Sequence, residues 1–246
     1  LIVEDKKNQG HILLMPEFEL LLKEIRDETK DVKSFIFERP ENFSFVAGQF
    51  ITIFLDVEDA RGNYRQFSIA SSPTEDVLMI TTTMRGSNFK NKLTGMLNQK
   101  IKVRGPFGRF VLQENSEHVM VAGGIGITPF RSMIKSATDI GNSAKIKLIY
   151  SNKTPEDIVF VEDLDLMEKM NENLEIIHTI TRPEGHFWKG VTGRVDEHMI
   201  EQYVEGMENP LFYICGPPAM VDAMQVVLKG MGVAEERVKF ESFTGY

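Results

Sequence analysis

Three glycines in the segment VAGGIGITPF are placed where a backbone turn could receive a phosphate group. Gly123, Gly124 and Gly126 follow an apolar run and precede a predicted helix, with Thr128 as its expected N-cap and Pro129 as its first residue. Glycine permits a tight turn and close approach to a ligand, and a helix N-terminus offers free N–H groups. The spacing favours a diphosphate-binding turn, although an ordinary strand–helix turn fits the same residues.

A second candidate segment is RQFSIASSP, which begins at Arg65. In a strand, Arg65 and Phe67 share one face and Ser68 lies on the other. A cation, a ring and a hydroxyl suit a ligand with phosphates and a flat ring system. The alternative without a ligand is a surface arginine beside a core phenylalanine.

A third segment, CGPPAM, places Cys215 directly after the apolar run LFYI. Ligands bind at the carboxyl ends of the strands in parallel sheets, so this position favours a site. The alternative is a buried cysteine that acts as a small hydrophobic residue.

The elements that must position these residues fall into two halves. Residues 17–113 contain short β-branched strands bounded by Gly, Pro, Asn and Asp, with one helix expected at 88–97, and predict an antiparallel barrel. Residues 114–246 alternate strands with helices and predict a parallel sheet wound by helices. One of these helices is expected to start after a cap at Thr154. Residues 1–16 are interpreted as an N-terminal extension or linker.

Composition limits the function further. The chain of 246 residues has a net charge of −8, which argues against a nucleic-acid partner. Its longest apolar run, FITIFL, is too short for an integral membrane segment. Cys215 is the one cysteine, so no iron–sulfur cluster and no metal site is expected, and a reducing cytoplasmic location is favoured.

Several of these segments, taken in order, resemble the motifs of the ferredoxin–NADP reductase family, which includes cytochrome b5 reductases and oxygenase reductase components. RQFS is similar to its R-x-[YF]-[ST] flavin motif, GPFG to a turn late in its flavin barrel, and GGIGITP and CGPPAM to its nicotinamide-nucleotide motifs. The terminal FESFTGY resembles its aromatic end. The resemblance extends from residue 17 to residue 246. It implies an antiparallel Greek-key flavin-binding barrel followed by a parallel-sheet nucleotide-binding α/β domain.

The resemblance also implies a set of site residues. The expected FAD contacts are Arg65, Gln66, Phe67, Ser68, Thr81, Thr83, Gly86, Ser87, Phe89, Lys90, Thr128 and Tyr246. The expected NAD(P) contacts are Gly123, Gly124, Gly126, Thr128, Pro129, Ser151, Asn152, Lys153, Cys215, Gly216, Pro217 and Met220. Ser68, Cys215 and Glu241 are expected to shape the pocket for hydride transfer, and the terminal Tyr246 to cover the flavin face.

Three departures from the family pattern affect these expectations. Phe67 replaces the usual tyrosine and Lys90 replaces a common serine. The strand end that often carries Asp or Glu in NAD sites reads Ser151, Asn152 and Lys153, within a stretch that favours NADH over NADPH.

The resemblance implies an FAD-dependent oxidoreductase that takes hydride from NADH or NADPH. Electrons are expected to pass to a separate acceptor, which is a ferredoxin-like protein, a haem protein or a small molecule. Two alternatives stay open, an electron-transfer subunit of a larger flavoprotein complex and a non-catalytic nucleotide-binding sensor. Reduction of a bound flavin by NADH would exclude the sensor.

Overall fold

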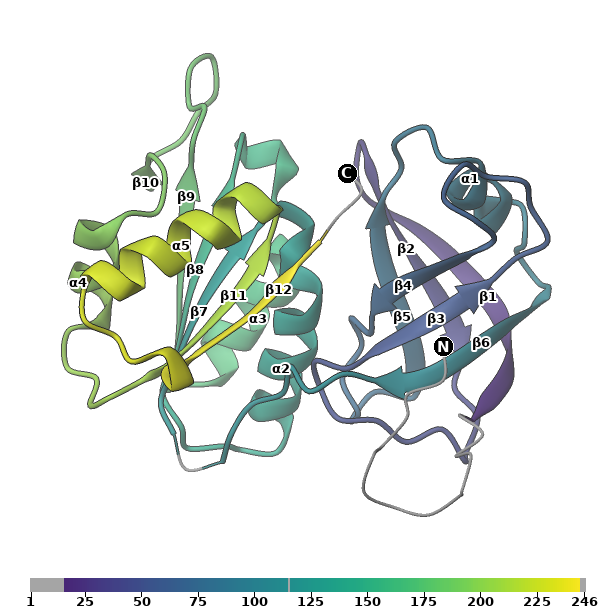
Figure 1. Cartoon of the computed structure of the whole chain (residues 1–246), viewed down its shortest axis with the longest axis horizontal. Coiled ribbons are helices and arrows are strands. Elements are labelled where there is room, and N and C mark those ends of the chain that lie inside the picture. Colours follow the sequence, from purple (N-terminus) through teal and green to yellow (C-terminus); the bar gives the residue numbers. More distant parts are fainter. Residues whose placement is uncertain (1–15, 115, 244–246) are drawn as a thin grey trace.

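The computed structural model of the protein describes residues 16–114 and 116–243, and it is built on two six-stranded sheets (Figure 1). The first sheet forms the half on the right of Figure 1, and the second, with its helices, forms the half on the left. The first is antiparallel and the second parallel, so the fold class predicted from the sequence is confirmed.

The first sheet is a closed barrel with the strand order β4-β3-β6-β1-β2-β5. Its strands are β1 (Glu17–Thr29), β2 (Val32–Glu38), β3 (Phe50–Phe54), β4 (Tyr64–Ser68), β5 (Val77–Thr83) and β6 (Lys100–Phe107). An isolated bridge between Ile69 and Ile80 joins the two ends of this order. In β1, Leu20 and Leu22 are buried whereas Glu19 is exposed, and this alternation fills the barrel with apolar side chains.

Helix α1 (Asn88–Thr94) lies between β5 and β6 in the chain. Ser87 is its N-cap, and the Ser87 Oγ accepts a hydrogen bond from the Lys90 backbone N–H. Phe89 and Leu93 are buried in the barrel core. The predicted helix is therefore present, and it ends at Thr94 with Gly95 as its C-cap, before the expected residue 97.

The second sheet has the order β10-β9-β8-β7-β11-β12, with all neighbours parallel. Its strands are β7 (His118–Gly123), β8 (Ile146–Asn152), β9 (Leu174–Ile180), β10 (Val191–Thr192), β11 (Leu211–Gly216) and β12 (Val238–Ser242). The chain moves outward from β7 to β10 and then returns to β11, on the other side of β7. The crevice at the carboxyl ends of β7 and β11 is therefore the topological switch point, where such sheets bind ligands.

Helices cover both faces of the second sheet. They are α2 (Ile127–Asp139), α3 (Val161–Met170), α4 (Glu197–Val204) and α5 (Pro218–Gly230). One apolar cluster contains the buried side chains of α2 and α3, and a separate cluster contains those of α4 and α5. The first of these clusters also includes Ala47, Ala70 and Met79 of the barrel, so the two domains share a continuous apolar contact.

Two expected helix starts are wrong. Helix α2 begins at Ile127 after a 3₁₀ turn, and Thr128 lies inside it, where its Oγ1 donates to the Ile125 carbonyl at 3.2 Å instead of capping. Thr154 caps only a 3₁₀ turn over Pro155–Asp157. Helix α3 starts later, after Phe160. The left-handed φ of 63° at Phe160 separates the 3₁₀ turn from this helix. The short α4 and β10 have no counterpart in the sequence-based expectations.

The described part of the connection between the sheets, residues 108–114 and 116–117, contacts the second domain through Phe110. The Phe110 ring lies 5.7 Å from the Phe130 ring and 5.5 Å from the Tyr213 ring, measured between centroids. The predicted boundary between residues 113 and 114 stays a prediction within this connection. In the described part of the chain, no helix is long and apolar enough to cross a membrane.

Candidate functional site

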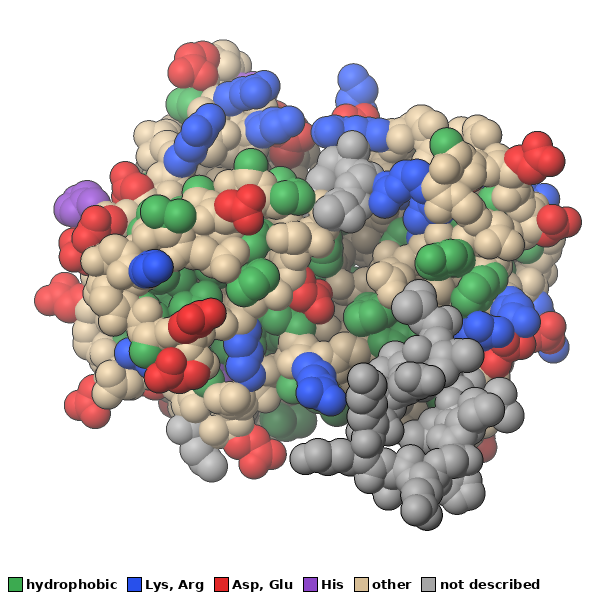
Figure 2. Space-filling model, viewed as in Figure 1, with side chains coloured by type: hydrophobic (Ala, Val, Ile, Leu, Met, Phe, Trp, Pro, Cys, Tyr) green, Lys and Arg blue, Asp and Glu red, His purple; other side chains and the backbone are tan. Residues whose placement is uncertain are grey.

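A cavity of about 470 Å³ opens between the barrel and the switch point of the parallel sheet. Figure 2 shows the hollow between the two halves of the molecule, with Lys and Arg side chains beside it. Its described lining consists of Phe50, Arg61, Tyr64, Arg65, Gln66, Phe67, Ser68, Thr81, Thr82, Thr83, Lys90, Ile125, Thr128, Glu241, Ser242 and Phe243. The lining therefore comes from β3, β4, β5 and α1 of the barrel, and from the start of α2 and the end of β12.

Many of the residues predicted from the sequence meet in this cavity. The structure brings together Arg65, Gln66, Phe67, Ser68, Thr81, Thr83, Lys90, Thr128 and Glu241. Sequence reasoning missed Phe50, Arg61, Tyr64, Thr82, Ile125, Ser242 and Phe243. Arg61 and Tyr64 just precede the RQFS motif, so only proximity in the sequence could have indicated them. Tyr246 lies outside the described residues.

One end of the cavity is strongly cationic. Lys90 is buried, and its ammonium group donates to the Thr83 carbonyl at 2.7 Å. Burial, and then the charges of Arg61, Arg65 and Arg85, lower the pKa of Lys90 to about 8. Four cationic side chains in so small a region favour an anionic ligand.

A carboxylate that does not itself line the cavity binds the donors at this cationic end. Asp59 pairs with the Arg65 guanidinium, and it accepts hydrogen bonds from the Phe89 backbone N–H at 3.0 Å and the Ser87 Oγ at 3.1 Å. Hydrogen bonds from the backbone N–H groups of Arg61 and Phe89 hold the pKa of Asp59 well below its usual range. The Asp59 carboxylate thus stands in for an anion, and the donors around it fit a diphosphate.

The Arg65 side chain is held in place on several sides. It is 9% exposed, and its Nη1 donates to the Gly62 carbonyl and the Arg61 carbonyl, each at 2.9 Å. Its guanidinium carbon lies 5.0 Å from the centre of the Phe89 ring. Arg65 and Phe67 are both buried, as expected for two residues on one face of a strand. The predicted contacts Gly86, Ser87 and Phe89 lie beside this end of the cavity without lining it.

The other end of the cavity carries neutral hydroxyls and one carboxyl group. Ser68 and Thr128 are 7% and 1% exposed, and they come from the two different domains. Glu241 joins them from β12, where it lies opposite Cys215 of β11 in the sheet register. Figure 1 shows β12 running toward the barrel, which brings Glu241 to the shared cavity.

The glycine turn packs against the end of β11 below the cavity. A Cβ atom at Gly126 would lie 2.2 Å from the Cys215 carbonyl oxygen, so only glycine fits there. Gly124 has a φ of 51°, which favours glycine. Gly123 packs on Gly216 and on the side chains of Pro217 and Met220. These predicted nucleotide contacts lie together at the switch point, at the edge of the cavity.

Three further groups of predicted nucleotide residues differ in exposure. Cys215 is fully buried, and burial together with the nearby Glu241 raises the pKa of its thiol well above the usual value. Pro129 is buried in α2. Ser151 and Asn152 end β8, next to β7 and β9, and Lys153 follows as an exposed residue. None of these residues lines the described cavity.

Glu241 predicts a pH dependence for the cavity. Burial raises its pKa from the ordinary value of 4.5 to about 7. Below that pH the carboxyl is neutral, and above it a carboxylate forms, which would stabilise positive charge on a nicotinamide bound in the cavity. We expect hydride transfer from NADH to become faster as pH rises through about 7, and Glu241→Gln to remove this rise. Stopped-flow measurements at saturating NADH across this range give the profile.

The raised pKa of Glu241 also predicts how the stability of the fold changes with pH. Measuring this change provides a control for the rate profile. The folded state holds the Glu241 proton more tightly than the unfolded state, so this group stabilises the fold below 4.5 and that contribution is lost as pH rises to about 7. Glu241→Gln should therefore be less sensitive to this pH rise in thermal unfolding. A rate profile that keeps its step near pH 7 in Glu241→Gln would assign the step to another group.

Comparison with known proteins agrees with this architecture. Residues 120–226 match the oxidoreductase NAD-binding domain family. NADH-cytochrome b5 reductase 1 of Aspergillus clavatus is 30% identical over 238 residues, which cover 89% of this chain and 76% of that protein. A component of the Na(+)-translocating NADH-quinone reductase of Pseudoalteromonas atlantica is 29% identical over 213 residues, 78% of this chain and 52% of that protein.

A solved ferredoxin NADP+ reductase from Neisseria gonorrhoeae has the same fold, with a TM-score of 0.77 and 22% identity over 92% of this chain and 98% of that one. The chain thus combines an antiparallel barrel with a parallel-sheet domain, most of which matches an NAD-binding domain, and a cavity lies between the two. The chain belongs to the ferredoxin–NADP reductase family. It spans about half the length of several curated relatives that it matches.

Proposed function

We propose that this chain is an FAD-dependent oxidoreductase that takes hydride from NADH and passes electrons to a separate acceptor. The observation that carries the proposal is the cavity itself, which joins a cationic end to an end with hydroxyl and carboxyl groups contributed by both domains. A bound flavin accepts hydride from a reduced nicotinamide and releases electrons singly or in pairs. The protein has to bind, orient and shield the two cofactors.

The cationic end supports the binding of the FAD diphosphate. Arg65 would hold it, together with the Ser87 hydroxyl and the Phe89 N–H that now bind Asp59. Phe67, Thr81 and Thr83 would line the flavin site of the barrel. For this, the Asp59 side chain has to release its donors, because a carboxylate and a diphosphate repel each other.

The switch point supports the binding of the nicotinamide nucleotide. The glycine turn after β7 and the CGPP segment after β11 lie side by side there. Ser68 and Thr128 would orient the two cofactors, and Glu241 would hold a proton or a charge at its carboxyl. The buried, neutral Cys215 would contribute shape to the floor of the site. The names of two relatives specify NADH, which supports NADH over NADPH as the donor.

The acceptor belongs to the same proposal. The names of the two relatives specify cytochrome b5 and a quinone reductase, so acceptors of more than one kind occur among similar chains. A separate haem or ferredoxin-like protein, or a small acceptor, fits a chain with a single cysteine. The single reduced cysteine also supports a cytoplasmic location.

The test is reduction of the FAD-loaded protein by NADH in the absence of oxygen. The proposal predicts a yellow protein whose visible absorption bleaches on mixing with NADH. Ser68→Ala should retain FAD and slow this bleaching about 10- to 100-fold, because it removes a hydrogen bond of about 1.5–3 kcal/mol to the reacting groups. Ser136→Ala on α2, away from the cavity, is the matched control.

Two results would contradict the proposal. A protein that binds no FAD, or one that stays yellow with both NADH and NADPH, would leave the nucleotide-sensor alternative. Unchanged bleaching in Ser68→Ala would refute the role of Ser68 alone.

A further inference from the structure

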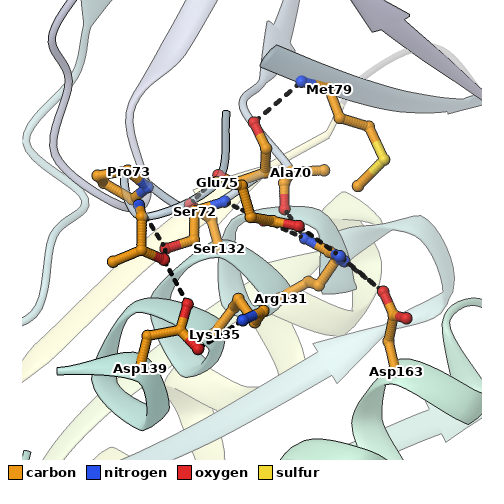
Figure 3. A network of polar contacts seen from close by, with 12 residues as sticks. Ala70, Ser72, Pro73, Glu75, Met79, Arg131, Ser132, Lys135, Asp139 and Asp163 are labelled. Carbon is orange, nitrogen blue, oxygen red and sulfur yellow. Dashed lines mark hydrogen bonds and ion pairs between the residues drawn. The ribbon is translucent and has the colours of Figure 1, made fainter. Parts of the chain in front are cut away.

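The segment that follows Ser68 is bound directly by helix α2 of the other domain. This segment, Ala70–Glu75, connects β4 to β5 in the barrel. Figure 3 shows Arg131 of α2 between Glu75 of this segment and Asp163 of α3. The Arg131 Nη1 lies 2.9 Å from Glu75 Oε2, and Nη2 lies 3.1 Å from Oε1, which is a bidentate pair.

Two backbone carbonyls of the same segment are also bound from α2. The Arg131 Nη1 donates to the Ala70 carbonyl at 2.9 Å, and the Ser132 Oγ donates to the Ser71 carbonyl at 2.6 Å. Arg131 is 6% exposed, and Ser71 and Ser132 are fully buried. We call these contacts of Arg131 and Ser132 with Ala70, Ser71 and Glu75 the interdomain latch.

The barrel holds its side of the latch in a defined position. The Ala70 N–H donates to the Met79 carbonyl at 2.7 Å, and the Ser71 Oγ accepts from the Met79 N–H at 2.9 Å. Arg39 donates to the Glu75 carbonyl at 2.9 Å. A displacement of α2 is therefore transmitted to β4 and β5 and is not absorbed by a loose loop.

In both domains, the latch residues follow closely in sequence a residue that lines the cavity. Ala70 and Ser71 come two and three residues after Ser68, and Arg131 and Ser132 come three and four residues after Thr128, one helical turn away. Ser68 and Thr128 face the same cavity from different domains. The latch thus sets the separation between the strand end that bears Ser68 and the helix start that bears Thr128.

The chemistry of the interface divides into two parts. Apolar side chains from both domains share one cluster, and such contact is attractive without being directional. Hydrogen bonds of the latch have defined lengths and angles, so they fix one relative position of the domains. Burial alone would lower the pKa of Arg131, but hydrogen bonding and charge from Glu75 and Asp163 raise it, so the guanidinium stays charged.

We propose that Arg131 and Ser132 are positioning residues, which fix the distance that hydride travels between nicotinamide and flavin. The inference rests on the proposed function. Reacting atoms must lie about 3–3.5 Å apart, and a misplacement of 1 Å costs about 100-fold in rate. A latch that holds the two walls of the cavity together therefore acts on the rate of hydride transfer and leaves the affinity for each cofactor unchanged.

The test compares Glu75→Gln with Asp163→Asn in the full chain. Each change removes one of the two carboxylate charges that pair with Arg131, but only Glu75 lies in the other domain. We expect Glu75→Gln to slow flavin reduction at saturating NADH about tenfold, with FAD affinity and NADH dissociation constant within about twofold of the parent. Asp163→Asn should change the rate less than about twofold. Ser132→Ala should act like Glu75→Gln, and it provides a second variant if Glu75→Gln folds poorly.

A deuterium isotope effect on reduction, measured with NADH labelled at the transferred hydrogen, separates positioning from folding. Under the proposal the slow step of Glu75→Gln and Ser132→Ala is hydride transfer, so the isotope effect is at least as large as in the parent. Equal rate losses in Glu75→Gln and Asp163→Asn would overturn the latch, as would a lower melting temperature with an unchanged rate. A parent protein that NADH does not reduce would instead refute the proposed function.

Discussion

Arg65→Ala is expected to weaken FAD binding about 100-fold or more. Two hydrogen bonds from a guanidinium to a diphosphate are each worth about 1.5–3 kcal/mol, and about 2.7 kcal/mol corresponds to 100-fold in affinity. Arg65 also pairs with the Asp59 carboxylate, so its removal takes away the opposite charge and leaves an anion next to the proposed diphosphate site. Titration of the FAD-free protein with FAD, followed by flavin fluorescence, measures the loss.

Two companion variants separate the possible reasons for weaker binding. Arg104→Ala removes a half-buried barrel arginine that pairs with Glu17 outside the cavity, and it should leave FAD affinity unchanged. Asp59→Asn removes the competing anion while keeping the size of the side chain, so it should tighten FAD binding several-fold. FAD binding of parental strength in Arg65→Ala would remove Arg65 from the diphosphate site.

Gly126→Ala is expected to abolish most NADH-driven reduction and to destabilise the α/β domain. The added methyl carbon would lie 2.2 Å from the Cys215 carbonyl oxygen and 2.6 Å from its carbonyl carbon. Because both atoms belong to the backbone of a central strand, β11 cannot yield, and the start of α2 has to move away from it. Forced overpacking of this kind costs about 1–3 kcal/mol. Thermal unfolding and the rate of flavin reduction measure the two effects.

Gly230→Ala is the matched control in the same domain. A Cβ atom at Gly230 meets nothing within 4 Å, and the residue ends helix α5. Alanine there should leave the reduction rate unchanged and stabilise the helix by up to about 1 kcal/mol. Gly126→Ala with parental reduction and parental stability would mean that the glycine turn adjusts freely, and would contradict its role as a fixed wall of the site.

The local signals in the sequence were sufficient for most of the elements, but not for the short α4 and β10 or for all of the helix ends. Thr128 followed by Pro129 is a typical helix start, yet α2 begins before both because the 3₁₀ turn over Gly124–Gly126 already leads into the helix. Thr154 has the hydrogen bonds of a capping box, but its turn ends at Asp157. Capping patterns report local hydrogen bonds, whereas the continuation of a helix depends on packing.

For this protein, the sequence by itself determined the order of most elements and the fold class, and several of the residues that it singled out line the cavity. These follow from contiguous signals, namely strand alternation, the glycine turn and RQFS with its resemblance to a flavin motif. Only the tertiary structure decided that Asp59 pairs with Arg65, and that Arg131 of α2 binds the segment that follows Ser68. The Arg131–Glu75 pair is formed by the packing of the two domains. Asp59 and Arg65 both belong to the barrel, and the fold of the loop between β3 and β4 brings them together.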